Sequence, residues 1–426
     1  MDILALNEKF KNCSCGREHT CPIDHIRIGK GVIDDIAELC HDYNNIMLVS
    51  DSNTYRVCGS NVASILGKKV KVNHILTPNP DIVVPNEEKI RELEGVLTED
   101  TDLIVGVGSG VINDLCKYVS FNRNLPYYIV ATAPSMDGYA SAGAAMILDG
   151  MKVTPGARPP KAIIADSRVM RDAPIDMIKS GYGDILGKFS CLNDWKLSSL
   201  VNGEYFCEEI YNLTYDMLMS TKDIGEKLME RNEDALITLM EALVGVGGAM
   251  AYCGTSRPAS GSEHHLSHYF EITGLLRNEP YFLHGIDVAY SAVYTQKLRE
   301  ELLEIDVPGN VYRMGKDAYE SKIKDIYTKA SDGVIALQNK LGWYNENKSE
   351  VYKNKWQEIK DILLEVPTSD KLISYLETVN LDISDFSDVY PEKKIREALF
   401  FAKDLKDRYT VLWLYFDLLG GKYYEK

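Results

Sequence analysis

The first 166 residues alternate between two kinds of segment, and this alternation restricts the possible fold more than any other feature. From Asp24 onward, short apolar segments typical of buried strands are separated by segments typical of helices. The predicted strands are residues 45–51, 70–76, 102–108, 125–134 and 161–166, and the predicted helices are residues 32–43, 52–67, 86–97 and 111–123. Such alternation predicts a mostly parallel α/β sheet with helices on both faces. Ligands of such sheets bind beyond the carboxyl ends of the strands, where Asp51, residues 106–110 and residues 132–137 fall.

The rest of the chain lacks the strand pattern and reads as a series of helices. Helical segments are predicted at residues 175–200, 235–253, 288–304 and 393–419. A chain of 426 residues is also too long for one small core. We therefore predict an α/β domain over residues 1–168 and an all-α domain over residues 169–426. Gly245, Gly247 and Gly248 lie inside the apolar segment 235–253, where we expect them to permit close helix contact.

The charge balance argues against two classes of partner. The chain has 63 acidic and 47 basic residues and a net charge of −16. Nucleic acid and anionic membranes both require a basic footprint, so neither is an expected partner. The nine cysteines are an odd number spread over a long chain, which favours a reducing compartment over a disulfide framework. Since the sequence has neither a signal-type apolar run nor a long uninterrupted apolar segment, we expect a cytoplasmic protein without a membrane span.

One cluster of cysteines lies near the start of the sequence. Residues 13–21, CSCGREHTC, place Cys13, Cys15, His19 and Cys21 close together. These residue types bind zinc, but a zinc finger has a second, distant ligand pair that this segment lacks. We therefore expect a mobile, reduced loop here rather than a metal site.

Four of the eight histidines lie in one stretch, residues 261–289. His264 and His268 are four residues apart, so on a helix both rings leave the same face one turn from each other. His284 follows a break in the helical pattern at Gly274 and Pro280, so we expect it at the start of a second helix. Two imidazoles from different helices and a carboxylate from elsewhere would make a three-ligand metal site with an open position, which is the catalytic arrangement. The alternative is that these histidines cap helices or form hydrogen bonds in a polar core.

Residues 105–117, VGVGSGVINDLCK, predict a strand, a glycine-rich turn and a helix. Such a turn presents backbone N–H groups and a helix N-terminus to a phosphate. The match to G-x-G-x-x-G is partial, because Val111 stands where the third glycine is expected, but a nucleotide site is favoured over a plain tight turn. Asp51 precedes the glycines, whereas the usual acidic residue follows them. It is expected either to accept a ribose hydroxyl, which would favour NAD over NADP, or to cap the helix that begins at Ser52.

Five motifs follow one another along the chain. They are G-x-G-S-G-x-x-N-D-x-x-K at residues 106–117, A-T-A-P-S-M-D-G-Y-A-S at 131–141, G-Y-G-D-I-L-G-K at 181–188, E-H-H-L-S-H-Y-F-E at 263–271 and L-H-G-I-D-V-A at 283–289. In this order they resemble the sn-glycerol-1-phosphate dehydrogenase family, within the superfamily of glycerol dehydrogenase, dehydroquinate synthase and iron-containing alcohol dehydrogenases. The opening Cys-x-Cys-Gly and the long helical tail are more similar to the bacterial branch of that family than to the archaeal one.

The resemblance implies a dehydroquinate synthase-like fold with a Rossmann-like dinucleotide-binding domain and a helical metal- and substrate-binding domain. It implies a divalent metal held by Asp184, His264 and His284, although Asp184 could instead cap a helix. Substrate contacts are implied for Asp137, Asp184 and His268, and Asp137 and His268 are rival candidates for proton transfer. Contacts to NAD or NADP are implied for Asp51, Gly108, Ser109, Gly110, Val111, Ile112, Thr132, Ser135 and Ser141. His265 matches no ligand position, and the candidates for phosphate contacts are Lys117, Lys188, Arg158 and Lys161.

The implied reaction is the reversible reduction of dihydroxyacetone phosphate to sn-glycerol 1-phosphate by NADH or NADPH, with a divalent metal polarising the ketone. The ligand types suit zinc, nickel or iron, and the resemblance favours nickel in bacterial members and zinc in archaeal ones. A homodimer is expected from the family and from the frequency of two-fold assemblies. The alternatives are a glycerol dehydrogenase acting on unphosphorylated glycerol, a dehydroquinate synthase-type lyase, and a metal-binding protein without enzymatic activity. Against the lyase, G-I-D-V follows the leucine–histidine pair at 283–284, where that enzyme's pattern resembles H-G-E-A-V.

Overall fold

The computed structural model of the chain describes residues 3–79, 82–148 and 151–424. The chain divides into two compact units, residues 1–185 with 212–256 and residues 186–211 with 257–426. The predicted domain limits, 1–168 and 169–426, follow the loss of strands rather than these units. The assignment of cofactor binding to residues 1–168 and of metal and substrate binding to residues 169–426 stays a prediction.

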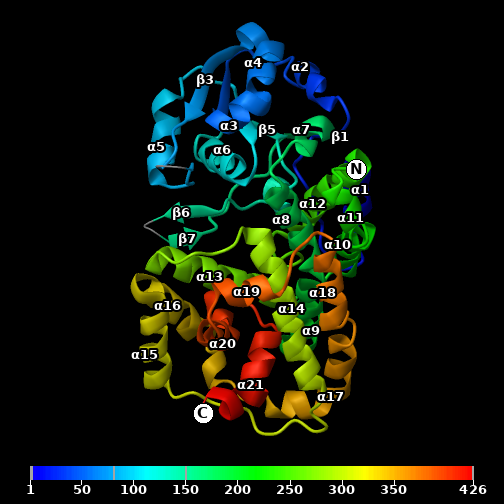
Figure 1. Cartoon of the computed structure of the whole chain (residues 1–426), viewed down its shortest axis with the longest axis vertical. Coiled ribbons are helices and arrows are strands. Elements are labelled where there is room, and N and C mark those ends of the chain that lie inside the picture. The colour runs from blue at the N-terminus through cyan, green and yellow to red at the C-terminus, as the bar shows by residue number, and fades with distance from the viewer. Residues whose placement is uncertain (1–2, 80–81, 149–150, 425–426) are drawn as a thin grey trace. The chain divides into compact units, whose positions relative to one another are not determined.

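A sheet of six parallel strands forms the centre of the first unit (Figure 1). Its order is β1-β8-β5-β4-β2-β3. The strands are β1 (His25–Gly29), β2 (Ile46–Asp51), β3 (Val70–Leu76), β4 (Leu103–Gly108), β5 (Tyr127–Ala131) and β8 (Ala162–Asp166). The predicted parallel α/β sheet is therefore confirmed. The strand order reverses between β2 and β4, which is the switch point at which open α/β sheets bind ligands.

Two strand features escaped the sequence analysis. β1 reads HIRIG, and all five of its residues are half-buried because it lies at the edge of the sheet and pairs with β8. An edge strand with charged and polar positions has no continuous apolar run to reveal it. The second feature is an antiparallel hairpin of β6 (Met146–Leu148) and β7 (Met151–Val153), whose strands are only three residues long.

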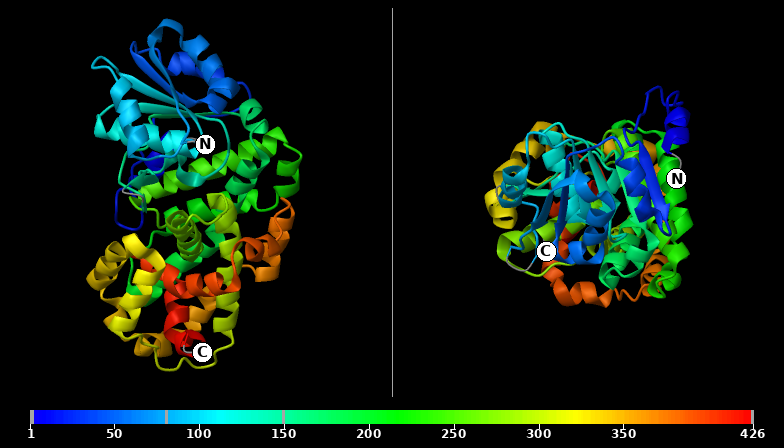
Figure 2. Two further views of the ribbon diagram at one scale, coloured as in Figure 1. Left: turned by 60° about the vertical axis from the view of Figure 1, so that its left-hand side comes forward. Right: turned by 90° about the horizontal axis from the view of Figure 1, so that it is seen from above.

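Helices pack on both faces of the sheet (Figure 2). On one face, α2 (Ile36–Leu39) and α4 (Ser60–Leu66) share a buried core with Leu48 and Val105. Side chains alternate along a strand, so Gly106 faces the other way. There a Cβ on Gly106 would lie 3.0 Å from the Cys116 sulfur of α6 (Gly110–Asn122). α5 (Glu87–Val96) packs beside α6.

The first unit also contains a long apolar helix, α12 (Glu233–Cys253). Among the described residues it alone is long and apolar enough to cross a membrane, but 72% of its apolar window is buried within the structure, as expected for a core helix. A Cβ on Gly247 would lie 2.6 Å from the Asp137 carbonyl oxygen, whereas one on Gly248 would meet nothing within 4 Å. Gly247 therefore permits a close contact with the turn η4 (Asp137–Ala140). The prediction was a close contact with another helix.

The remaining helices of the first unit are short or lie near its ends. They are α1 (Ile3–Phe10), η1 (Val32–Asp35), α3 (Ser52–Thr54), the π-helical turn η2 (Tyr55–Gly59), η3 (Gly67–Lys69), α7 (Ser167–Arg171), α8 (Ile175–Leu186), α10 (Glu208–Thr221) and α11 (Gly225–Met229). The predicted helix 52–67 is thus divided among α3, η2 and α4. The predicted helix 175–200 is interrupted at Gly187, where α8 ends.

The described residues of the second unit form helices joined by loops, without strands, as predicted. Its elements are α9 (Lys188–Asn202), α13 (Ser262–Arg277), α14 (His284–Leu303), α15 (Lys316–Tyr327), η5 (Thr328–Ala330), α16 (Ser331–Leu341), η6 (Trp343–Asn345), α17 (Ser349–Leu363), α18 (Ser369–Glu377), α19 (Ser384–Val389), α20 (Glu392–Phe401), η7 (Ala402–Leu405) and α21 (Val411–Tyr424). The predicted helix 393–419 is therefore two helices, α20 and α21, joined by a 3₁₀ turn.

Candidate active site

Three of the predicted cofactor contacts lie at the carboxyl edge of neighbouring strands. β2 ends at Asp51 and pairs with β4, which ends at Gly108. Gly108 in turn pairs with Ala131 at the end of β5, and the N–H of Thr132 donates to the Gly108 carbonyl at 3.1 Å. Asp51, Gly108 and Thr132 therefore share the edge of the sheet where its strand order reverses, which is the expected position for a dinucleotide.

The glycine-rich turn leads directly from β4 into α6. Gly108 ends the strand, Ser109 is the N-cap residue, and Gly110 begins a helix of 13 residues. A Cβ on Gly108 would lie 2.4 Å from the Ile112 side chain, so the turn requires glycine at this position. Val111 and Ile112 stand in the first turn of α6. The N-terminal N–H groups of this helix are suited to binding a pyrophosphate.

Asp51 caps α3. Its Oδ1 accepts the N–H groups of Asn53 at 2.9 Å and Thr54 at 2.8 Å, while the Asp51 N–H donates to the Thr54 hydroxyl at 3.0 Å. The capping role proposed as an alternative is therefore present. These bonds use Oδ1, so capping does not exclude a ribose contact through Oδ2.

The segment after β5 is held against α8. The Ser180 hydroxyl of α8 donates to the Ser135 carbonyl at 3.0 Å. A Cβ on Gly181 would lie 1.9 Å from the Pro134 carbonyl oxygen, which explains why glycine follows Ser180. Ser135 and Thr132 are both buried. The loop that carries these predicted cofactor contacts is thus fixed to the helix that carries Asp184.

Lys117, a candidate phosphate contact, instead stabilises the loop that follows. Its Nζ donates to the carbonyls of Gly138 at 2.7 Å and Gly143 at 3.1 Å, and to the Ser141 hydroxyl at 3.1 Å. The side chain is completely buried, and this burial lowers the pKa of Lys117 to about 8. The Ser141 hydroxyl itself donates to the carbonyls of Gly138 and Gly143 at 3.0 Å. Both side chains are therefore used within the protein.

The other candidate phosphate contacts also have protein partners. Lys188 is buried and donates to a backbone carbonyl at residue 259 at 3.0 Å. Arg158 donates to Asn124 at 2.8 Å, and Lys161 forms an ion pair with Asp24 at 3.1 Å. Lys161 immediately precedes β8 and therefore lies at the amino edge of the sheet, opposite the predicted cofactor edge.

Asp184 lies inside α8 and is fully buried. Its Oδ2 accepts the backbone N–H of Asp137 at 2.9 Å. The alternative that Asp184 caps its own helix is wrong, because the residue stands near the end of α8 rather than before its start. Asp137, also buried, begins η4, the turn on which Gly247 packs.

The start of α13 is fixed by α9. The Ser262 N–H donates to Asp194 Oδ2 of α9 at 2.7 Å, and a Cβ on Gly261 would lie 2.6 Å from the same oxygen. α9 therefore positions the first turn of α13, which carries His264.

The histidines lie as their spacing predicted. His264 and His268 are on α13 with ring centroids 6.0 Å apart, and His284 is the first residue of α14. The His284 ring centroid lies 5.1 Å from that of His264 and 5.6 Å from that of His268. The predicted break at Pro280 is confirmed, because this residue lies between α13 and α14. Gly274, in contrast, lies within α13, which ends before Asn278, a residue in the left-handed region at φ 53°.

Ligand atoms of Asp184, His264 and His284 all lie within 4.8 Å of one another. Asp184 and His264 are buried, and His284 is partly exposed. One carboxylate and two imidazoles match the donor set of a catalytic divalent metal, and three protein ligands leave a coordination position open. His268 stands beside both imidazoles and is half-buried.

Glu263 is a further residue of this group that the sequence analysis missed. Its Oε1 lies 2.7 Å from His264 Nδ1 and also accepts the Gly261 N–H at 2.9 Å. Burial raises the pKa of Glu263, while the bond from Gly261 and the charge of Lys188 oppose that shift. A carboxylate on one ring nitrogen orients a ligand histidine so that the other nitrogen faces the metal. Glu263 directly precedes His264 in sequence, but adjacent helix residues are not expected to face one another.

His265 is separate from the ligand group. It is completely buried, and neither ring nitrogen has a hydrogen-bond partner among the described residues. Burial, reinforced by the nearby charges of Lys406, Arg408 and Arg257, lowers the pKa of His265 well below 6.5. The ring is therefore neutral at pH 7. His265 does not belong to the described group of ligand atoms formed by Asp184, His264 and His284.

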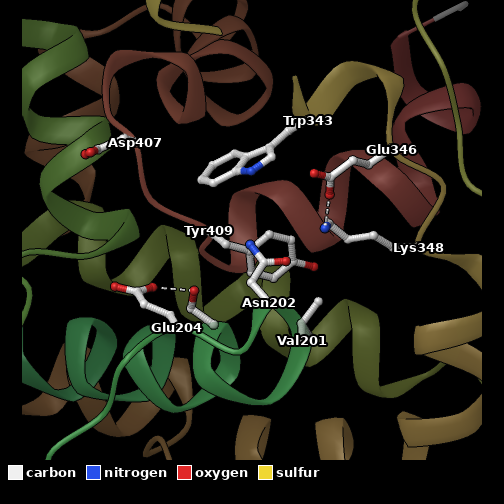
Figure 3. A pocket seen from close by; sticks show the side chains of 9 residues that line it. Val201, Asn202, Glu204, Trp343, Glu346, Lys348, Asp407 and Tyr409 are labelled. Carbon is white, nitrogen blue, oxygen red and sulfur yellow. Dashed lines mark hydrogen bonds and ion pairs between the residues drawn. The ribbon is translucent and has the colours of Figure 1, made fainter. Parts of the chain in front are cut away.

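A cavity of about 450 Å³ in the second unit contains none of the predicted site residues (Figure 3). It is lined by Ser198, Val201, Asn202, Glu204, Trp343, Glu346, Lys348, Asp407 and Tyr409. Glu204 accepts a hydrogen bond from Ser198, and Glu346 pairs with Lys348. Because the cavity contains none of the predicted catalytic, metal or cofactor residues, we assign it no role in the chemistry.

Comparison with known proteins agrees with this geometry. Residues 27–174 match the family model for iron-containing alcohol dehydrogenase. A glycerol-1-phosphate dehydrogenase (NAD(P)+) of Halalkalibacterium halodurans is 35% identical over 68% of this chain and 75% of its own length. The protein of the same name from Bacillus licheniformis is 31% identical over 94% of this chain and 90% of its own. That from Pyrococcus furiosus is 30% identical over 68% and 85%.

Solved structures share the fold at much lower sequence identity. Glycerol dehydrogenase from Schizosaccharomyces pombe superposes with a TM-score of 0.55 at 14% identity, covering 91% of this chain and 93% of its own. An archaeal alcohol dehydrogenase from a Red Sea brine pool gives 0.56 at 16% identity, covering 94% and 98%. The structural matches support the fold, and the sequence matches are close enough to decide the family. The chain belongs to the glycerol-1-phosphate dehydrogenase family.

Proposed function

We propose that this protein catalyses the reversible, NAD(P)H-dependent and metal-dependent reduction of dihydroxyacetone phosphate to sn-glycerol 1-phosphate. The main support is the group formed by Asp184, His264 and His284, whose ligand atoms lie within 4.8 Å of one another. The relatives' shared name, glycerol-1-phosphate dehydrogenase (NAD(P)+), supports the substrate and the cofactor class.

The three side chains fit a divalent cation, which when bound would act as a Lewis acid on the ketone while NAD(P)H supplies the hydride. Two neutral imidazoles and one carboxylate preserve a net positive charge for that purpose. Glu263 holds the His264 ring through Nδ1, and the Asp137 N–H holds the Asp184 carboxylate. These two hydrogen bonds fix the donor atoms before any ligand arrives, which lowers the cost of assembling the site.

Two residues compete for the role of proton donor to the product oxygen. His268 is half-buried and stands next to both proposed ligand rings. Asp137 is buried, and its backbone is bonded to Asp184. A histidine titrates near neutral pH, and so His268 is the better match for a general acid at pH 7. We propose substrate contacts from Asp137, Asp184 and His268, with His268 as the proton-transfer group.

The cofactor contacts in this proposal are those at the carboxyl edge of the sheet: Asp51, Gly108, Ser109, Gly110, Val111, Ile112, Thr132 and Ser135. For Ser141, whose hydroxyl bonds within its own loop, we propose a positioning role in place of the predicted direct contact. The metal in this proposal is nickel or zinc, and the protein is a cytoplasmic homodimer.

The decisive experiment measures oxidation of NADH and NADPH with dihydroxyacetone phosphate and with dihydroxyacetone, before and after chelation. Activity that requires the phosphorylated ketone, falls on chelation and returns with zinc or nickel is the expected result. Chiral analysis of the product then identifies the sn-1 isomer. Activity that chelation leaves unchanged would contradict the metal-dependent mechanism.

A glycerol dehydrogenase acting on unphosphorylated glycerol is the second candidate function. The observation in its favour is that Lys117 and Lys188, two candidate phosphate contacts, are both buried and donate to backbone carbonyls. The same assay separates the two functions, because this candidate requires a strong preference for dihydroxyacetone over its phosphate.

A further inference from the structure

A second group of metal-binding side chains shares no residue with the proposed active site. Ligand atoms of Cys13, Cys15, His19 and Cys207 all lie within 4.8 Å of one another. Three cysteines and one histidine form a complete ligand set for a tetrahedral structural zinc site. We infer that these four residues bind a structural zinc ion.

The fourth ligand is Cys207, which the sequence analysis could not connect to the N-terminal cysteines. Within residues 13–21 the nearest candidate was Cys21, but it is not part of the group. The Cys21 backbone exchanges hydrogen bonds with the Asn7 side chain at 3.0 and 3.1 Å, and burial raises the pKa of its thiol to about 11. Cys21 therefore belongs to the packed core, and the distant cysteine completes the set.

Cys207 is held in place by the helix that follows it. α10 begins at the next residue, and the Tyr211 N–H donates to the Cys207 carbonyl at 2.9 Å. Cys207 therefore stands immediately before the first turn of α10 and accepts a hydrogen bond from that turn. Cys207 is completely buried.

The hydrogen bond of His19 leaves the correct nitrogen for a metal. Nδ1 lies 2.8 Å from the carbonyl oxygen of Tyr252. A carbonyl can only accept, so Nδ1 carries the proton and Nε2 carries the lone pair. Nε2 lies 3.1 Å from Cys15 Sγ, on the side of the cysteines. A backbone carbonyl on the outer nitrogen is the usual partner of a zinc-bound histidine.

The backbone around Cys15 suits a thiolate. The Arg17 N–H donates to Cys15 Sγ at 3.4 Å, and the Gly16 N–H donates to the Cys13 carbonyl at 3.1 Å. Gly16 adopts φ +80°, in the left-handed region that favours glycine, and this turn brings both cysteine side chains to one side. An N–H bond to sulfur stabilises the charged form of the thiol, the form that binds metal.

The chemistry of the donor set distinguishes this site from the active site. Zinc with three thiolates and a neutral imidazole has a net charge of −1, and its formation releases the three thiol protons. All four positions are filled by protein, so the ion has no open position for substrate and its role is structural. In contrast, the Asp184 group has no sulfur ligand, and cobalt(II) is therefore a selective probe.

The test uses the purified full-length chain, stripped of metal under reducing conditions and reloaded with zinc or cobalt. We expect an intense thiolate-to-cobalt charge-transfer absorption, and zinc should protect the partly exposed Cys13 and Cys15 from alkylation as read by peptide mass spectrometry. The double variant Cys13→Ser/Cys15→Ser should bind one zinc equivalent fewer per chain and lose the absorption band. Cys253→Ser, with similar exposure but outside the group, is the matched control and should keep both.

The wild-type measurements need no variant, so a double variant that fails to fold leaves the test intact. Absence of the charge-transfer band in cobalt-loaded wild-type protein would overturn the proposal, as would equal alkylation of Cys13 and Cys15 with and without zinc. A disulfide between Cys207 and Cys13 or Cys15 in protein isolated without added oxidant would also overturn it. The band should persist in His264→Ala, so failure of the active-site proposal would not affect this result.

Discussion

The backbone N–H of Asp137 donates to Asp184 Oδ2 at 2.9 Å, which joins a proposed substrate contact to a proposed metal ligand. Both residues are buried. Asp184 lies on α8, and Asp137 begins η4, so the bond connects two elements that are separated in sequence. A change at Asp184 therefore affects two things, the charge offered to the metal and the anchor of the Asp137 loop.

Substituting Asp184 by asparagine separates these two effects. The side-chain amide oxygen can still accept the Asp137 N–H, so we expect the free energy of unfolding of the metal-free protein to change by only about 1 kcal/mol. The lost negative charge should weaken metal binding by more than the roughly 10–100-fold that typically follows loss of an outer partner. Titration calorimetry with zinc or nickel measures the affinity. Asp176→Asn, at the exposed start of α8, is the control, and unchanged affinity in Asp184→Asn would remove it from the ligand set.

Glu263→Gln tests the hydrogen bond behind His264. The amide retains an acceptor for the Gly261 N–H but loses the negative charge that favours a proton on His264 Nδ1. We expect the metal affinity to fall about 10–100-fold, with a smaller effect on folding. Competition with a chromogenic chelator measures the change. A variant that binds metal as tightly as the wild type would show that Glu263 serves only to close the turn at Gly261.

The parts of this site that follow from local periodicity were predictable from sequence. The spacing of His264 and His268 placed both rings on one helix face, and alternating segments placed Asp51 and Gly108 at the ends of strands. Contacts that depend on distant parts of the chain were not predictable. Cys207 reaches the N-terminal cysteines only through the tertiary fold.

Two other differences come from effects that sequence spacing does not report. Lys117 has a positive charge and follows the glycine-rich turn, so it was a candidate phosphate contact. Its ammonium group instead donates to three acceptors of one loop. Glu263 bonds to the residue next to it because the first turn of α13 leaves the Gly261 N–H and the His264 ring on the same side. The edge strand β1 was not predicted, because its residues are half-buried and do not form a continuous apolar run.

His265→Leu should give a protein that is less sensitive to acid. The folded-state pKa of His265 is well below its unfolded value of about 6.5, so below that pH the unfolded chain binds a proton that the folded chain does not. Stability is therefore lost as the pH falls, by up to about 1.4 kcal/mol per pH unit from this group. Leucine removes this loss and the two unsatisfied nitrogens. Urea unfolding at pH 7 and pH 5.5 should show an advantage of the variant that grows at the lower pH, with metal affinity at pH 7 unchanged.

Asp51→Asn tests whether Asp51 contacts the ribose as well as capping α3. Asparagine is as good an N-cap as aspartate, so stability should change little, whereas Asp51→Ala should cost about 1 kcal/mol. Removal of the negative charge should favour the cofactor that carries a 2′-phosphate. We expect the ratio of kcat/KM for NADPH to that for NADH to rise about tenfold, which corresponds to about 1.4 kcal/mol. An unchanged ratio in Asp51→Asn would leave capping as the role of this residue.

Two neighbouring glycines of α12 provide a matched pair of substitutions. Alanine is more favourable than glycine inside a helix by about 1 kcal/mol, and a Cβ on Gly248 would meet nothing within 4 Å. Gly248→Ala should therefore raise the free energy of unfolding by about 1 kcal/mol. At Gly247 the same Cβ would lie 2.6 Å from the Asp137 carbonyl oxygen and 2.9 Å from the Ala140 Cβ. Overpacking of this kind typically costs about 1–3 kcal/mol, so Gly247→Ala should be less stable than the wild type.

The same pair tests whether the position of Asp137 matters for catalysis. Gly247→Ala pushes η4 away from α12 and so strains the bond between Asp137 and Asp184. We expect its kcat to fall by about tenfold or more, because small misplacements of catalytic groups are costly, while Gly248→Ala keeps wild-type kcat. Steady-state kinetics at saturating metal, at a temperature where both variants are folded, isolates this effect from stability. Equal kcat values in the two variants would mean that the turn tolerates displacement and that Asp137 does not need this anchor.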